Sequence, residues 1–373
     1  MKNKIKATIQ SLLSQAGITI NGQNPWDIIV HDERLYSRVL SAGSLGFGEA
    51  YMDGWWDAER PDELFTRILN ARLEERVGRN WNIAWHALAA RLLNMQSRRR
   101  AFEIGKAHYD KGNDLYSAML DSRMTYTCGY WRGAQTLSQA QEAKLDLVCK
   151  KIGLKSGDRV LDIGCGWGSF AKFASERYGA SVVGITVSKA QIELGRKMCA
   201  GLPIELRLQD YREVNDGPYD HIVSLGMFEH VGYKNYRVYM EVVRRLLKPN
   251  GLFLLHTIGG NTSVKNTDHW IEKYIFPNSM LPSIAQIGAA IEGLFVVEDW
   301  HNFGTDYDRT LMAWYKNVES HWDKLKQQYD ERFHRMWKFY LLSCAATFRA
   351  RKSQLWQIVL SPNGIAGDYR SIR

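Results

Sequence analysis

Residues Val160–Phe170, with the sequence VLDIGCGWGSF, indicate the fold class of this chain. The run starting at Val160 is apolar, as in a buried strand, and it ends in three glycines at alternate positions. Such glycines let a backbone turn tightly and approach a ligand closely. Residues 169–177 then have the pattern of a helix. The loop therefore lies between the carboxyl end of a strand and a helix N-terminus, where open α/β sheets bind ligands.

This glycine loop fits S-adenosylmethionine better than a dinucleotide. A dinucleotide loop reads G-x-G-x-x-G and needs an acidic residue at the end of the next strand, but here a serine replaces the last glycine and that strand ends in Thr186. The pattern D-x-G-x-G-x-G, formed by Asp162, Gly164, Gly166 and Gly168, is typical of class I methyltransferases. A turn without a ligand is the alternative, although so many glycines are entropically costly unless the backbone needs them.

Strand and helix patterns alternate regularly after residue 159, which predicts a doubly wound, Rossmann-like α/β sheet. The predicted strands are 160–163, 181–185, 204–208, 221–225, 252–256, 295–300 and 356–360, and clear helices are predicted at 137–152, 169–177 and 235–247. The segment Leu311–Tyr315 fits a strand or a helix. We predict a mainly helical N-terminal domain over 1–100 and a catalytic domain over 101–373. Within the former, Gly43–Trp56, GSLGFGEAYMDGWW, predicts a compact turn packed on aromatic rings.

The composition is that of a soluble globular protein, with 45% hydrophobic and 24% charged residues. No apolar run is long enough to span a bilayer, and the N-terminus MKNKIKATIQ lacks the apolar core of a signal peptide. The five cysteines are scattered and show no C-x-x-C spacing. We therefore expect a reduced cytoplasmic protein without a disulfide framework, a zinc site or another metal.

The net charge of +9 is concentrated near the C-terminus, where residues 309–373 hold 12 Lys and Arg against 5 Asp and Glu. Such an excess attracts nucleic acid or anionic lipid. Arg332, Arg335 and Lys338 recur at helical spacing among aromatic residues. A helix docked on the core with a solvated basic face is the plainer interpretation, and lipid docking is the alternative.

The predicted strand ends bring a set of polar side chains to one edge of the sheet. Asp210 could accept a hydrogen bond from an adenine amino group, although surface turns carry aspartate as often. Glu229 and His256 end neighbouring strands, and a buried carboxylate near a histidine is typical of functional sites. We predict that the cofactor is bound at these strand ends by Asp162, Gly164, Gly166, Gly168, Thr186, Gln191, Gln209 and Asp210, and also by Tyr126 and Thr127 of the segment that precedes the first strand.

Nearly end to end, the chain resembles the bacterial cyclopropane-fatty-acyl-phospholipid synthases of the enterobacterial type. The related mycolic-acid enzymes share the catalytic domain but lack a comparable N-terminal domain. Specific motifs carry the resemblance, and they are GSLGFGEAYMDGWW, HYDKGNDLY, YTCGYW, VLDIGCGWGSF, VVGITVSKAQ, LQDYRE, GMFEHVG, LLHTIG, KYIFPN, DWHNFGTDYDRTLMAWY and FRARKSQLWQ. The glycine loop alone would indicate little, because many unrelated methyltransferases share it.

The resemblance implies transfer of a methylene unit from S-adenosylmethionine to the cis double bond of an unsaturated phospholipid acyl chain. It also implies a bound bicarbonate that deprotonates the carbocation formed on the way to the cyclopropane ring. The implied holders of bicarbonate are Cys128, Glu229, His256, Ile258 through its backbone, and Tyr307. The rings implied as candidates for cation–π contact with the carbocation are those of Tyr126, Phe228, Trp270, Tyr274 and Tyr307.

The resemblance further implies a homodimer that is cytoplasmic and peripherally associated with anionic lipid of the inner membrane, and that binds no nucleic acid. One alternative is an S-adenosylmethionine enzyme that methylates an alkene without ring closure, or methylates a heteroatom. Cys128, Glu229, His256 and Tyr307 together argue against it, because simple methyl transfer needs no bicarbonate. A second alternative is a catalytically silent lipid- or nucleic-acid-binding module, which the intact glycine loop disfavours.

Overall fold

The computed structural model describes residues 2–73, 112–367 and 369–373. They pack into two units, each assembled from separate stretches of the chain. The first joins the N-terminal elements to Thr267–Pro277 and Tyr307–Ser353, and the second holds 112–266, Asn278–Asp306 and Gln354–Arg373. The predicted domain boundary near residue 100 lies outside the described residues.

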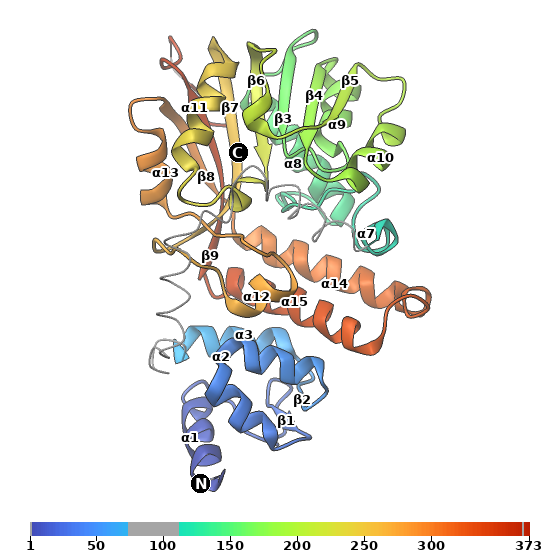
Figure 1. Cartoon of the computed structure of the whole chain (residues 1–373), viewed down its shortest axis with the longest axis vertical. Helices are drawn as coiled ribbons and strands as arrows, with labels where there is room; N and C mark the ends of the chain where they lie inside the picture. Colours follow the sequence, from blue (N-terminus) through green and yellow to red (C-terminus); the bar gives the residue numbers. More distant parts are fainter. Residues whose placement is uncertain (1, 74–111, 368) are drawn as a thin grey trace. The chain divides into compact units, whose positions relative to one another are not determined.

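The second unit is built on a seven-stranded sheet with the order β5-β4-β3-β6-β7-β9-β8 (Figure 1). Its strands are β3 (Arg159–Ile163), β4 (Ser181–Thr186), β5 (Ile204–Leu208), β6 (Tyr219–Leu225), β7 (Leu247–Gly260), β8 (Val296–Asn302) and β9 (Ser353–Ser361). The neighbours from β5 to β7 run parallel, whereas β8 and β9 are antiparallel. All seven predicted strands are confirmed, and with them the α/β fold.

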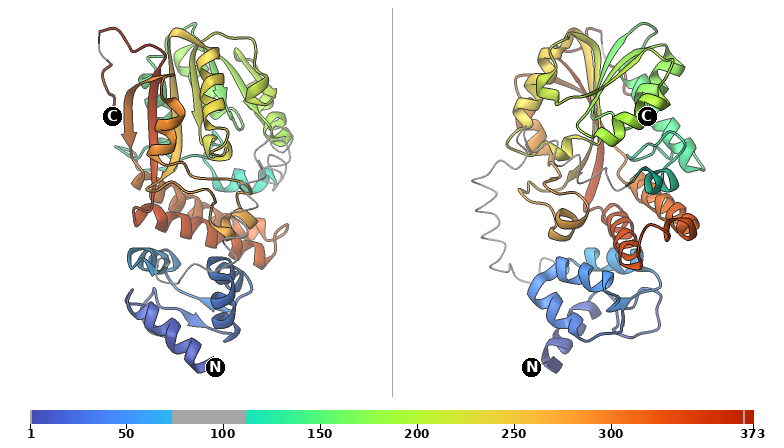
Figure 2. Two further views of the ribbon diagram at one scale, coloured as in Figure 1. Left: turned by 60° about the vertical axis from the view of Figure 1, so that its left-hand side comes forward. Right: turned by 45° about the vertical axis from the view of Figure 1, so that its right-hand side comes forward.

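Helices cover both faces of this sheet (Figure 2). The elements around the strands are α7 (Asn113–Met119), α8 (Leu137–Lys151), α9 (Ser169–Tyr178), α10 (Lys189–Met198), η1 (Tyr211–Glu213), η2 (Phe228–His230), α11 (Tyr236–Leu246) and α13 (Ile284–Ile291). Strand side chains alternate between faces, so Val160 joins the core beneath α8 and α9 while Leu161 joins the core beneath α11 and α13. The alternation predicted from β3 therefore creates two apolar layers.

The first unit is mainly helical. Its elements are α1 (Lys2–Ser14), β1 (Ile29–Val30), α2 (Arg34–Met52), β2 (Trp56–Asp57), α3 (Pro61–Asn70), α12 (His269–Tyr274), α14 (Thr305–Leu325) and α15 (Glu331–Arg349). Aromatic rings form its centre, where Phe47 stacks on Trp56 at 4.3 Å and Phe339 meets Phe65 at 5.0 Å and Trp270 at 4.5 Å between centroids. None of the helices in the described ranges is long and apolar enough to cross a membrane.

The compact turn predicted over Gly43–Trp56 is wrong, because α2 continues to Met52 beyond a kink at Gly43. The glycines of this segment serve close packing instead. A Cβ at Gly48 would lie 2.4 Å from the ring of Trp270. The missing side chain therefore lets α12 pack directly on α2, and this contact was not readable from local glycine density.

Two of the three cations predicted to form a basic stripe on α15 have internal partners. Arg335 donates to the carbonyl of Trp56 at 2.9 Å and to Asp57 at 2.8 Å, and Arg332 bonds Asp53 at 3.0 Å. These pairs fasten α15 to the N-terminal elements of the same unit. Arg332 and Arg335 therefore hold α15 against the N-terminal elements, as in the docked helix of the plainer interpretation, but the largely buried Arg335 is not part of a solvated face.

Candidate active site

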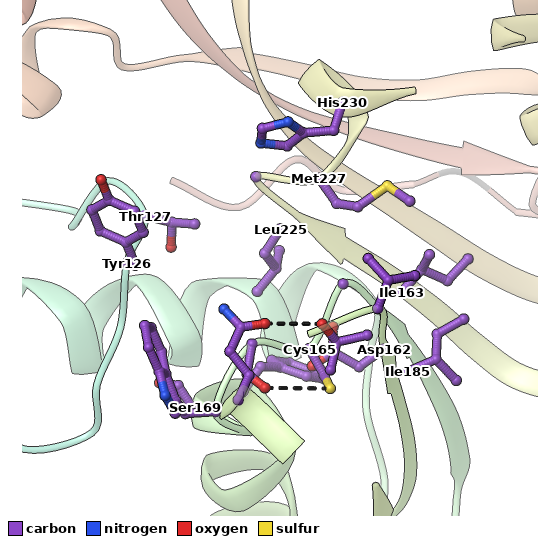
Figure 3. Close-up of a pocket in the computed structure, with 18 of the residues that line it drawn as sticks. Tyr126, Thr127, Asp162, Ile163, Cys165, Ser169, Ile185, Leu225, Met227 and His230 are labelled. Carbon is purple, nitrogen blue, oxygen red and sulfur yellow. Dashed lines mark hydrogen bonds between the residues drawn. The ribbon is translucent and has the colours of Figure 1, made fainter. Parts of the chain in front are cut away.

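The principal pocket of the second unit opens at the carboxyl ends of β3, β4, β5 and β6 (Figure 3). Nine of the ten residues predicted to bind the cofactor line it: Tyr126, Thr127, Asp162, Gly164, Gly166, Thr186, Gln191, Gln209 and Asp210. Gly168 is not among its lining residues and instead precedes α9, where a Cβ would come 2.8 Å from Cys199 Sγ. The sequence therefore predicted the position of the pocket. Gly168 lies outside its lining and allows the close approach of Cys199.

The glycine loop forms one wall of this pocket. Gly164 and Gly166 adopt φ values of 86° and 56°, which other residues rarely take. A Cβ at Gly164 would meet Met227 at 2.6 Å, whereas one at Gly166 would come no closer than 3.9 Å, to Gln191. The loop is thus packed tightly at Gly164 against Met227, which follows β6, and stays open toward the pocket at Gly166.

Asp162 places a carboxylate at the centre of the pocket wall. Its side chain is almost fully buried, and in the described part of the chain Oδ1 has no hydrogen-bond partner. Burial raises the pKa of Asp162 to about 7, and the nearby ammonium of Lys144 counteracts that rise. A buried acceptor without a partner is costly unless a ligand satisfies it, so Asp162 fits a cofactor that donates hydrogen bonds.

The ends of β4 and β5 supply polar groups whose orientation is fixed by hydrogen bonds within the chain. The hydroxyl of Thr186 donates to Gln191 Oε1 at 2.9 Å, so the two form a pair on the pocket wall. Asp210 binds Arg212 with both oxygens, at 2.8 and 2.6 Å. Oδ1 also accepts from the backbone N–H of Arg212 at 3.0 Å, so acceptor capacity remains on Oδ2, and the arginine fixes the orientation of the carboxylate.

Lys144 also lines the pocket, although the sequence analysis did not single it out. It lies on α8 and is fully buried, with Nζ 2.7 Å from the hydroxyl of Thr127. The available signal was its spacing, because Ala140, Lys144 and Val148 fall at four-residue steps on the buried stripe of that helix. A lysine on such a stripe indicates a buried charge.

A second group of predicted residues gathers around the ends of β6 and β7. Glu229 lies in η2, where Oε1 accepts from the backbone N–H of Ile258 at 2.7 Å. Oε2 has no hydrogen-bond partner within the described ranges. Burial raises the pKa of Glu229 to about 7, and the Ile258 N–H counteracts part of the rise. Because this N–H is already bonded, the backbone of Ile258 positions Glu229.

His256 lies on β7 opposite Leu225 of β6. Gln357 donates from Nε2 to Nδ1 of His256 at 3.3 Å, which places the proton of the neutral ring on Nε2. Burial, together with the charges of Lys144 and Lys151, holds the pKa of His256 well below its ordinary value. Among the described residues Nε2 has no partner, so a neutral donor is available in a buried place. Gln357 was not predicted as a site residue. The feature of the sequence that could have identified it is the single amide within the apolar run LWQIVL.

The other two predicted bicarbonate holders lie in different units. Cys128 belongs to the sheet unit, where its buried thiol donates to the carbonyl of Gly129 at 3.1 Å. Tyr307 belongs to the helical unit, and its ring packs against Trp314 and Phe348. The structure therefore groups Cys128 with Glu229, Ile258 and His256 in one unit.

The predicted aromatic candidates are also divided. Tyr126 lines the pocket, and Phe228 is buried in a stack on Tyr236 at 4.2 Å between centroids. Trp270 and Tyr274 belong to α12 of the helical unit. Trp270 is buried against Phe339, and the hydroxyl of Tyr274 bonds Glu49 at 2.8 Å.

The chain resembles proteins of known function over most of its length. Residues 96–358 match the model of the mycolic acid cyclopropane synthetase family. The cyclopropane-fatty-acyl-phospholipid synthase of Escherichia coli (strain K12) is 52% identical over 362 residues, which cover 97% of this chain and 94% of that protein.

Two solved structures resemble the chain at 32% identity, each covering 69% of this chain and 97% of its own. The cyclopropane synthase MmaA2 from Mycobacterium tuberculosis aligns with a TM-score of 0.65. The mycolic acid cyclopropane synthase CmaA1 complexed with SAH and CTAB aligns with a TM-score of 0.64.

Proposed function

The chain belongs to the mycolic acid cyclopropane synthetase family of S-adenosylmethionine-dependent enzymes, and from this membership we propose that it forms cyclopropane rings in unsaturated phospholipid acyl chains. The observation that carries the proposal lies beside the cofactor pocket. Two buried groups, Glu229 Oε2 and His256 Nε2, have no partner in the described part of the chain; Glu229 follows β6, and His256 lies on the neighbouring strand β7. Simple methyl transfer would not need this second polar site.

The first chemical step requires only the cofactor pocket and an alkene. The π electrons of the acyl chain attack the methyl carbon, the carbon–sulfur bond breaks, and a carbocation remains on the chain. We assign binding of S-adenosylmethionine to the pocket residues, because Asp162 offers an unpaired acceptor and Gly166 leaves the backbone open to a ligand. Asp210 is oriented by Arg212 to accept a further hydrogen bond.

Ring closure requires loss of a proton from the transferred carbon, so that the released electron pair can form the second carbon–carbon bond. Bicarbonate, when bound, would supply the base for that proton. The residues fit this anion, because His256 offers a neutral N–H and Glu229 an oxygen, both buried and without partners among the described residues. Cys128 lies in the same unit, with its thiol donating to the carbonyl of Gly129, and the N–H of Ile258 fixes the Glu229 carboxylate. Burial of these groups excludes water that would trap the cation.

We also propose that the enzyme acts as a homodimer peripherally associated with anionic lipid. The net charge of +9 and a substrate that resides in a membrane support lipid association. Arg332 and Arg335 do not belong to the docking surface in this proposal, because their charges are matched by carboxylates. Vesicle sedimentation and analytical ultracentrifugation test the two statements separately.

Mass spectrometry of phospholipid tests the proposed reaction. Purified protein is incubated with S-adenosylmethionine and vesicles of unsaturated lipid, with and without bicarbonate. A gain of one methylene with loss of the double bond, faster with bicarbonate, is the expected result. A product that keeps an alkene would indicate methyl transfer instead, and an unchanged lipid mass with bound cofactor would indicate a different acceptor.

A further inference from the structure

Lys144 is a buried cation to which the proposed reaction assigns no role. Its side chain is fully buried on α8, and its ammonium bonds the hydroxyl of Thr127 at 2.7 Å. Lys151 lies two turns further along the same buried stripe and contacts Asp299 at 3.2 Å. Lys144 differs from Lys151 in this respect, because within the described ranges its ammonium makes no such contact with a carboxylate. A buried ammonium without a contacting carboxylate is costly to maintain, which calls for an explanation.

Thr127, the partner of Lys144, connects the two parts of the site. Its carbonyl accepts from Gln141 Nε2 at 2.7 Å, so α8 holds both its backbone and its side chain. A Cβ on Gly226 would lie 2.7 Å from the Thr127 methyl group, so these residues are in close contact. The N–H of Gly226 in turn donates to the carbonyl of His256 at 2.8 Å. A continuous path of contacts therefore runs from Lys144 through Thr127 to the strand that carries His256.

The charge of Lys144 reaches both parts of the site. Its ammonium interacts electrostatically with Asp121, Cys128 and Asp162, and it acts on His256 as well. The Asp121 carboxylate is occupied by the backbone N–H groups of Thr125 and Arg123, at 2.8 and 3.2 Å. A positive charge in this buried place favours an anion next to Cys128 and His256, because electrostatic interactions are strong where water is excluded.

We propose that Lys144 is a positioning residue that couples the cofactor pocket to the anion site. Its ammonium holds Thr127 on the cofactor side, and its charge stabilises an anion between Cys128, Glu229 and His256 on the other. The inference rests on the proposed function, since that function supplies the anion. It assigns separate tasks to the bond and to the charge, so the two can be measured independently.

Three variants of the full chain separate these tasks. Lys144→Met removes the bond and the charge while keeping a long buried side chain, and Thr127→Val removes the bond but keeps the methyl group that packs on Gly226. Lys151→Met is the matched control, because it removes the other buried lysine of α8. For each, calorimetry measures the affinity for S-adenosylhomocysteine. The rise of the thermal midpoint with bicarbonate gives the half-saturating bicarbonate concentration.

We expect Lys144→Met to raise the half-saturating bicarbonate concentration about tenfold or more and to weaken S-adenosylhomocysteine binding about fivefold. Thr127→Val should weaken S-adenosylhomocysteine about as much while changing the bicarbonate value less than about threefold. The charge of Lys151 also acts on His256, but its ammonium contacts the buried carboxylate of Asp299, so Lys151→Met should change both quantities less than about threefold.

Wild-type values for both quantities in Lys144→Met would overturn the inference, as would equal changes in Lys144→Met and Lys151→Met. If Lys144→Met does not fold, unchanged S-adenosylhomocysteine affinity in Thr127→Val overturns the positioning role by itself. A wild-type protein that does not respond to bicarbonate would instead refute the proposed base, and with it the role assigned to the charge.

Discussion

Replacing Glu229 with glutamine should make the stability of the protein relative to wild type rise with pH, and it should lower turnover steeply. Burial raises the pKa of Glu229 from its ordinary 4.5 to about 7. Between these values the folded state binds more protons than the unfolded state, so this group's contribution to stability falls as the pH rises and is lost above about pH 7. The full difference corresponds to about 3 kcal/mol.

Glutamine keeps the oxygen that accepts from Ile258 but cannot ionise. Between about pH 5 and about pH 8, the free energy of unfolding of Glu229→Gln relative to wild type should therefore rise by about 2.5 kcal/mol. Urea titrations at the two pH values give this double difference, in which any pH-independent cost of the amide cancels. Turnover should fall steeply while S-adenosylhomocysteine binding stays unchanged.

The control for this comparison is Glu241→Gln, which removes an exposed carboxylate of α11 that pairs with Arg237. It should change neither the pH dependence of stability nor turnover. Parallel pH dependences for Glu229→Gln and wild type would show that Glu229 is not the buried, titrating group described above. Near-normal turnover of Glu229→Gln would show that the Glu229 carboxylate takes no part in the reaction.

Two further substitutions test particular contacts. Gln357→Met removes the donor to Nδ1 of His256. It should lower turnover about tenfold or more and leave the affinity for S-adenosylhomocysteine unchanged. A wild-type rate would show that the Gln357 amide does not orient the His256 ring. Arg335→Gln loses its bonds to Trp56 and Asp57 and should lower the free energy of unfolding by about 2 kcal/mol without weakening binding to anionic vesicles. Weaker vesicle binding at unchanged stability would make Arg335 part of the docking surface after all.

The sheet was predictable because local patterns determine it. Val160, Leu161 and Ile163 form a short apolar run that leads into closely spaced glycines, and the strands that begin at Ser181, Tyr219 and Leu247 contain comparable apolar runs. The rule that ligands meet the carboxyl ends of parallel strands then located the pocket. Asp162 and Thr186 line it for that reason.

The parts that were missed depend on contacts between distant residues. The role of Gly48 is set by Trp270, which is more than two hundred residues away, so local glycine density indicated a turn where a helix forms. Lys144 and Gln357 are polar residues inside apolar patterns, and their partners become visible only when the chain is folded. Sequence spacing marks such positions as unusual but does not identify what they contact.

The most direct test of the central proposal counts deuterium in the product formed from S-adenosylmethionine with a fully deuterated methyl group. Ring formation removes one hydrogen from the transferred carbon, so the lipid should gain a carbon that retains two of the three deuterium atoms and should lose its double bond. A product that retains all three would show methyl transfer without ring closure and would contradict the proposed role of Glu229 and His256.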